Sequence, residues 1–289
     1  MRKVLAIALF LFALCSISSI SAERSFAEGG KSLQIKGSDT MVNLGQAWAE
    51  EFNKIRPDVN ISVTGGGSGT GISALISGTC DIAESSRAMA DKEIKQAGEK
   101  GVKPLENIVA LDGIAVVINP KNPVKDLTLD QLRDIFMGTI ENWKAVGGKD
   151  MPIVLLSREV NSGTHIFFKE HVIRKGNAKG PEEFSPSALL MPSSQAIADE
   201  VTNNENTIGY YGMGYITSKQ KTIAVGKSKD GPFIEPTIEN VKSNTYPISR
   251  PLYFCTNGEP KDAVKDFISF VHSNEGQEIV RKLDFVPVK

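Results

Sequence analysis

Hydrophobic side chains recur every three or four residues in several stretches of the chain, which is the spacing of one face of a helix. The clearest case is Met41–Arg56, and Pro57 ends it because proline cannot continue a helix. The same pattern predicts further helices over Ser73–Ser77, Asp91–Lys100, Leu127–Phe136, His165–Lys175, Met191–Thr202 and Lys261–Arg281.

Short runs of apolar and β-branched residues alternate with these helices and predict strands. The longest run, within Glu106–Asn119, is almost continuously apolar, which is typical of a buried parallel strand. This alternation of strands and helices predicts an α/β protein. The other predicted strands are Leu33–Lys36, Val59–Val63, Asp81–Ala83, Ile153–Leu156, Ile208–Ile216 and Arg250–Thr256.

Residues 1–27 have the pattern of a secretory signal peptide. Two basic residues precede the apolar run Val4–Leu14, and small-residue cleavage motifs end at Ala22 and Ala27. The run is shorter than the roughly 20 residues that a membrane-spanning helix needs. Lipid attachment at Cys15 is the weaker alternative, because Leu14 is bulky where lipoprotein processing requires a small residue. We therefore expect an exported, periplasmic protein.

The charges of the chain nearly cancel, with 33 Lys and Arg residues against 34 Asp and Glu residues. This balance excludes the broad basic surface of a nucleic-acid-binding protein. After removal of the leader only Cys80 and Cys255 remain, and they form either a disulfide or two buried thiols. With three His in all and no paired ligand spacing, we expect no metal and no cofactor.

Candidate chemistry begins in the glycine-rich stretch Thr64–Ile72, which lies between a predicted strand and a predicted helix. Its glycines allow the backbone to approach a bound group closely, and Ser68 and Thr70 add hydroxyl donors. Unpaired N–H groups at the start of the helix would face the same group, so the stretch predicts an anion site. An ordinary exposed turn is the alternative for this loop alone.

Hydroxyl or guanidinium groups also follow three other predicted strands. In open α/β sheets ligands bind beyond the carboxyl ends of the strands, so these groups are expected to meet around one small oxyanion. The four sets are Ser38 with Thr40, Ser68 with Thr70, Ser86 with Arg87, and Arg158 with Ser162 and Thr164.

Three of these positions have simpler interpretations. Asp39 or Thr40 fits the N-cap of the helix that follows. Arg87 fits a surface ion pair with Asp91 or Glu93. His165 fits a role in capping or lining its own helix.

Asp112 interrupts the apolar run in Glu106–Asn119 and needs a partner, because an isolated buried charge is very costly. Its carboxylate is satisfied either by backbone N–H groups or by a hydrogen bond from a ligand.

Taken together, these motifs resemble the periplasmic phosphate-binding proteins of phosphate-specific ABC transporters, in their shorter form. The resemblance extends from about Gln34 to Val286. The motifs that carry it, in order, are Gly37–Met41, Gly65–Ile72, Asp81–Arg87, Leu111–Gly113 and Ser157–Thr164.

The resemblance implies an α/β, two-lobe type II periplasmic binding protein that holds phosphate in a cleft and is not an enzyme. Each lobe would be a mixed, mostly parallel sheet flanked by helices. Residues 32–115 with 251–289 would form one lobe and residues 116–250 the other, with two hinge crossings. The partners implied are phosphate and the membrane permease, and the binding protein is expected to be a monomer.

The resemblance also implies the ligands. It assigns phosphate contacts to Ser38, Thr40, Ser68, Ser162, Gly163 and Thr164, with Arg158 as the charge partner. Longer family members carry an Asp in the segment that corresponds to Ser85–Arg87, and this chain does not. We therefore expect Asp112 to accept the phosphate proton, and Ser86 and Arg87 to add contacts.

Three other functions remain open from the sequence, one of them a purely structural or adhesive surface protein. A binding protein for sulfate, molybdate or tungstate would use similar donors. An exported serine hydrolase would use Ser68 or Ser162 as nucleophile, but no G-x-S-x-G elbow stands in the right context and no His is an evident partner.

Overall fold

The computed structural model describes residues 31–289, and the predicted signal peptide lies outside the described residues. Within this range one mixed sheet has the strand order β2-β1-β3-β12-β4-β8-β6-β7, with β9 also paired to β4. Its strands are β1 (Lys31–Gly37), β2 (Val59–Thr64), β3 (Ile82–Ser85), β4 (Pro104–Ile118), β6 (Val154–Arg158), β7 (Leu189–Met191), β8 (Thr207–Gly212), β9 (Lys221–Thr222) and β12 (Ser249–Asn257).

A smaller sheet joins β5 (Asp126–Thr128), β10 (Ala224–Gly226) and β11 (Phe233–Ile234). The α-helices are α1 (Val42–Ile55), α2 (Ser68–Ile76), α3 (Asp91–Glu99), α4 (Leu129–Phe136), α5 (Gly163–Phe168), α6 (Ser194–Asn203), α7 (Ile238–Lys242), α8 (Asp262–Val271) and α9 (Asn274–Lys282). The predicted α/β class is confirmed.

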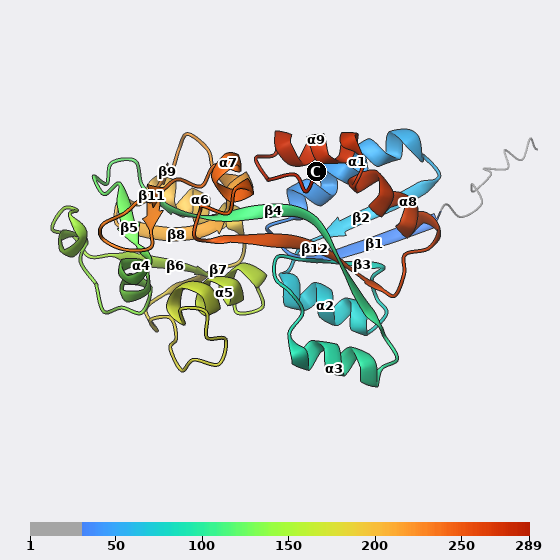
Figure 1. Ribbon diagram of the computed structural model, residues 1–289, viewed down its shortest axis with the longest axis horizontal. Coiled ribbons are helices and arrows are strands. Elements are labelled where there is room, and N and C mark those ends of the chain that lie inside the picture. Colours follow the sequence, from blue (N-terminus) through green and yellow to red (C-terminus); the bar gives the residue numbers. More distant parts are fainter. Residues whose placement is uncertain (1–30) are drawn as a thin grey trace, which may run out of the picture. The chain divides into compact units, whose positions relative to one another are not determined.

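The long strands β4 and β12 run side by side through the middle of the sheet (Figure 1). At one end of these two strands lies a core that includes Trp48, Phe254 and Phe267, and it is enclosed by α1, α8 and α9. Around their other end a second core includes Phe136 and Tyr210. The indole N–H of Trp48 donates to the carbonyl of α9 residue Gly276 at 2.8 Å, so burial of this ring leaves no polar atom unpaired.

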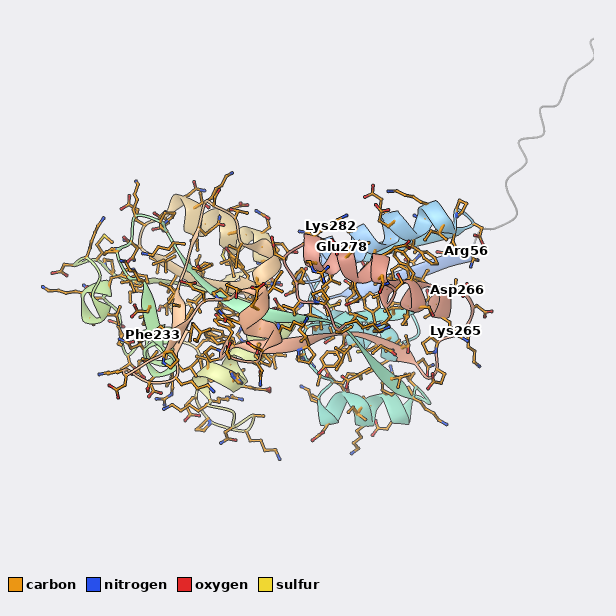
Figure 2. All side chains as sticks on the ribbon, turned by 45° about the horizontal axis from the view of Figure 1, so that its top comes forward. Arg56, Phe233, Lys265, Asp266, Glu278 and Lys282 are labelled. Atoms are coloured by element: carbon orange, nitrogen blue, oxygen red, sulfur yellow. The ribbon has the colours of Figure 1, made fainter. Side chains whose placement is uncertain are left out.

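On the surface, the guanidinium group of Arg56 after α1 pairs with Asp266 on α8 at 2.6 Å (Figure 2). It also pairs with Asp58. Exposed pairs of this kind contribute little to stability, because water and salt screen them. The buried hydrophobic cores therefore carry most of the stability. Among residues 31–289 we find no helix that is both long enough and apolar enough to span a bilayer.

Several predicted elements need correction. Strand β4 is antiparallel to its neighbours β12 and β8, although its apolar run was expected in a parallel strand. Burial on both faces produces the same composition in either orientation, so the neighbours decide. Helix α2 begins at Ser68, inside the glycine stretch, rather than at Ser73.

The predicted helix Lys261–Arg281 is two helices, because Ser273 caps α9 by accepting from the N–H of Gly276 at 3.1 Å. The helix predicted from His165 is α5 followed by a π-helical turn, Lys169–Ile173. The predicted strand Ile208–Ile216 ends at Gly212, where a 3₁₀ turn begins. Cys80 and Cys255 are both free and buried, so they form no disulfide.

Candidate functional site

The start of α5 is the point where several predicted ligands meet. Ser162 caps this helix, since its hydroxyl oxygen accepts from the N–H of His165 at 3.4 Å. The N–H groups of Gly163 and Thr164 are in the first turn and have no acceptor within the helix. A Cβ on Gly163 would lie 2.4 Å from the Ser68 hydroxyl and 2.6 Å from that of Ser86. Only glycine therefore fits against this pair.

The two serines come from different elements and bond to each other. The hydroxyls of Ser68 and Ser86 are 3.2 Å apart, and the N–H of Ser86 donates to the Ser68 hydroxyl at 3.0 Å. Both side chains are fully buried, and Ser38 is 2 % exposed. Ser38 directly follows β1, so its hydroxyl lies near the end of that strand.

A second group of hydroxyls joins residues far apart in the chain. The Thr40 and Thr164 hydroxyls are 2.9 Å apart, although 124 positions separate them. The guanidinium Nη2 of Arg250 donates to the Thr164 hydroxyl at 2.9 Å. The turn after β1, the start of α5 and strand β12 therefore meet at one buried point.

Arg250 also provides the partner that Asp112 requires. The two residues are direct neighbours in the register of β12 and β4, and Nε and Nη2 of Arg250 donate to Oδ2 of Asp112 at 3.0 and 2.8 Å. The N–H of Met213 donates to Oδ1 at 3.0 Å. Burial raises the pKa of Asp112 even though Arg250 opposes the shift, and burial lowers the pKa of Arg250.

The geometry is that of an ion pair, because an arginine remains protonated at neutral pH. Both side chains are fully buried. The Nη1 of Arg250 is buried without a hydrogen-bond partner in the described part of the chain, which leaves donors available for a ligand. Sequence reasoning missed Arg250. The available signal was that the buried Asp112 required a cation and that Arg250 stands in an otherwise apolar strand.

Arg158, the predicted charge partner of the anion, makes its hydrogen bonds with other groups of the protein. Its Nη2 donates to the carboxylate of Asp39 at 2.8 Å and to the carbonyl of Pro192 at 3.0 Å. Its Nε and Nη1 donate to the Met191 carbonyl and the Ser194 hydroxyl. The guanidinium group thus connects the turn after β1 to the segment before α6. Most of its donors are already used within the protein.

Asp39 is not the N-cap of α1, as the simpler interpretation had it. Met41 occupies that position and makes no side-chain cap. Asp39 instead accepts from Arg158 and from the N–H of Gly66 at 2.9 Å, and its carbonyl accepts from the Tyr215 hydroxyl at 2.6 Å. Its contacts therefore join the glycine stretch to β6 and to the turn after β8.

Arg87 pairs with Glu93, as its simpler interpretation had it, but the pair is buried instead of lying on the surface. Its two terminal nitrogens donate to the two carboxylate oxygens of Glu93 at 2.8 and 2.7 Å, and both side chains are largely buried. Burial alone would raise the pKa of Glu93, but the hydrogen bonds from Arg87 and Ala90 and the charge of Arg87 together lower it. None of the hydrogen bonds of Arg87 goes to another predicted ligand. Its charge is directed to Glu93.

The Ser68 and Ser162 hydroxyls have no imidazole partner in the described residues. The ring of His165 lies 3.2 Å from a different hydroxyl, that of Ser157, which is fully buried and also bonds Tyr210. Burial lowers the pKa of His165 to about 4. This pair is inaccessible to a substrate, so the geometry does not favour a hydrolase.

A cleft of about 1020 Å³ is lined by Arg250 and, among the predicted phosphate ligands, by Arg87. Its walls include Thr70, Arg87, Asn161, Arg250 and Tyr253. Within the described range no group of three or more His, Cys, Asp or Glu side chains could hold a metal ion.

Glu84, at the end of β3, is buried without a hydrogen-bond partner for either carboxylate oxygen within residues 31–289. A Cβ on Gly45 of α1 would lie 2.2 Å from its Oε1. Burial, with a contribution from the charge of Asp39, raises the pKa of Glu84 well above 4.5. Glu84 is therefore expected to hold a proton in the folded protein at a pH where it would be ionised in the unfolded chain.

This proton predicts a pH-dependent stability. Between the usual pKa of 4.5 and the raised one, unfolding releases the proton, so the free energy of unfolding falls as pH rises. The slope approaches about 1.4 kcal/mol per pH unit. Glu84→Gln cannot ionise and should remove this component, whereas Glu50→Gln on the exposed face of α1 should retain it. Urea unfolding across the acidic to mildly alkaline range measures both, and a slope that survives in Glu84→Gln would contradict the assignment.

The comparisons with known proteins show the family of this chain. Residues 23–275 match the family model described as a PBP superfamily domain. The phosphate-binding protein PstS of Pseudomonas aeruginosa is 35 % identical over 269 residues, which cover 87 % of this chain and 81 % of that protein. The PstS of Bacillus subtilis is 34 % identical, with 89 % and 81 % covered.

Solved structures give the same result. A putative phosphate ABC transporter substrate-binding protein with bound phosphate from Clostridium perfringens is 38 % identical, with a TM-score of 0.80, covering 90 % of this chain and all of that one. An ABC-type phosphate transport receptor from Vibrio cholerae is 30 % identical, with a TM-score of 0.69, covering 88 % and 99 %.

Proposed function

This chain belongs to the PstS family of phosphate-binding proteins, and from that premise we propose that it binds inorganic phosphate and delivers it to an ABC transporter permease. The observation that supports the site is the meeting of Thr40, Thr164 and Arg250. Thr40 lies in the turn after β1, Thr164 in α5 and Arg250 in β12, so the three residues are far apart in the sequence. Such convergence of hydroxyl and guanidinium donors suits a small tetrahedral anion.

In the proposed complex the phosphate oxygens accept hydrogen bonds from four side-chain hydroxyls, from the first N–H groups of α5, and from the unpartnered Nη1 of Arg250. Ser38, Thr40, Ser68 and Thr164 are the hydroxyl donors, and Gly163 contributes its N–H. Ser86 and Ser162 hold Ser68 and the helix start in place. Arg158 acts through Asp39, which it bonds, rather than on the anion.

Asp112 is the proposed acceptor of the phosphate P–OH. Its carboxylate has about four acceptor positions, and Arg250 and Met213 use three of them. Phosphate keeps at least one proton near neutral pH, whereas sulfate has none. A site built around such a hydroxyl rejects an analogue that lacks it by roughly 10⁴-fold.

The chain is proposed to work as an exported, monomeric carrier without catalysis. Residues 32–115 with 251–289 would form one lobe and residues 116–250 the other, and they would close around the anion by bending where β4 and β12 cross between them. Closure of this kind would report the bound state to a permease through shape.

A thermal-shift panel on protein freed of bound anion tests the function. With a micromolar Kd, about 1 mM phosphate should add about 4 kcal/mol to the stability of the folded state. The midpoint should then rise by about 8 °C or more. Sulfate, molybdate and tungstate should produce little shift. An equal shift with sulfate would favour a different oxyanion, and no shift with any of them would contradict the proposal.

A further inference from the structure

The glycine-rich stretch makes close contacts that anion binding does not require. The N–H of Gly69 donates to the carbonyl of Asn161 at 3.0 Å. The side-chain amide of Asn161 donates to the carbonyl of Gly66 at 2.8 Å and to the Thr70 hydroxyl at 3.3 Å. Asn161 lies in the turn between β6 and α5, so these bonds join two segments more than 90 residues apart.

The glycines are what make this approach possible. A Cβ on Gly67 would lie 2.8 Å from the carbonyl oxygen of Asn161, and one on Gly69 would lie 3.3 Å from it. Gly66 and Gly67 also have φ values of +113° and +88°, a backbone conformation that favours glycine. The glycines of this stretch therefore stand at the positions where the backbone of Asn161 comes too close for a larger residue.

In both segments, the residues that form the Asn161 contact are direct neighbours of proposed phosphate ligands. Ser68 lies between the glycines that touch Asn161, and Ser162 and Gly163 follow Asn161 in the chain. We propose that Asn161 is a positioning residue: it latches the glycine stretch to the start of α5 and sets the rate at which phosphate is released. This inference rests on the proposed phosphate binding, and on the two segments separating when the ligand leaves.

The latch would act on dissociation more than on association, because its bonds must break before the two segments separate. Loss of the two side-chain hydrogen bonds should speed release about 10-fold, which corresponds to about 1.4 kcal/mol. The rate of association should stay within about twofold, since differences between related complexes lie mostly in dissociation. A purely structural role would instead lower the stability of the phosphate-free protein.

The test measures release of radiolabelled phosphate into an excess of unlabelled phosphate. Asn161→Asp keeps the shape of the side chain but removes its N–H donors, and Asn161→Ala removes the shape as well as the donors. Each variant should release phosphate about 10-fold faster. Gly69→Ala should act in the same direction through its contact with the Asn161 carbonyl.

Matched controls are Asn53→Ala on the exposed face of α1 and Gly98→Ala in α3, where an added Cβ would meet no atom within 4 Å. Release within twofold of the original rate in Asn161→Asp would overturn the latch, as would an equal loss in the association rate. If the unaltered protein itself bound no phosphate, the proposed function would fail instead. The two failures are therefore distinguishable.

Discussion

Replacing Arg250 with Met is expected to weaken phosphate binding by about 10²- to 10³-fold or more, because it removes a buried charged donor from the anion. The same change should lower the free energy of unfolding by about 3–5 kcal/mol, since Asp112 then remains as an unpaired charge in a fully buried site. Isothermal calorimetry measures the first effect, and urea unfolding of the phosphate-free protein measures the second.

A double variant separates these two effects. Arg250→Met with Asp112→Asn removes both charges but keeps an acceptor for the N–H of Met213. We expect it to recover most of the stability, as replaced buried ion pairs commonly do, without recovering phosphate binding. Normal binding by the double variant would show that Arg250 is not a ligand. A loss of stability below about 1 kcal/mol in the single variant would show that the pair is not truly buried and charged.

Replacing Asp112 with Asn should weaken phosphate binding and reduce its preference over sulfate from roughly 10⁴-fold to about 10-fold or less, because the acceptor for the P–OH proton is lost. Calorimetric titrations with the two anions at one pH give the ratio. Asp150→Asn is a suitable control, since that carboxylate is exposed and pairs with Lys144 and Asn142 of its own turn. An unchanged ratio in Asp112→Asn would rule out Asp112 as the discriminating group.

Local signals in the sequence predicted the elements that local physics determines. The apolar face of Met41–Arg56 and the proline after it fixed α1 to within a residue at each end. The expectation that hydroxyls after the strands gather around one point agrees with the pairs Ser68 with Ser86 and Thr40 with Thr164. The sheet is mixed, however, and β6 runs opposite to β1 and β3, so these strand ends face one another instead of sharing one edge. A single hydrophobic face predicted one C-terminal helix, because the periodicity continues across the break at Ser273.

The sequence alone could not predict which residues form pairs when they lie far apart in the chain. Arg250 and Asp112 meet because β12 pairs with β4 across 138 positions, and no local pattern encodes that register. Arg158 turns to Asp39 for the same kind of reason. Arg87, by contrast, pairs with Glu93, six residues further along the chain. The sequence suggested this ion pair but could not decide between it and a contact of Arg87 with the ligand.

In the proposed complex, hydroxyl-bearing turns distant in the chain hold one ion together with Arg250. A crystal structure of the protein grown with phosphate tests this most directly. We expect tetrahedral density within hydrogen-bond distance of the hydroxyls of Ser68 and Thr164, the N–H of Gly163 and the guanidinium group of Arg250. Density in which phosphate occupies another surface, or touches only one of these groups, would contradict the account.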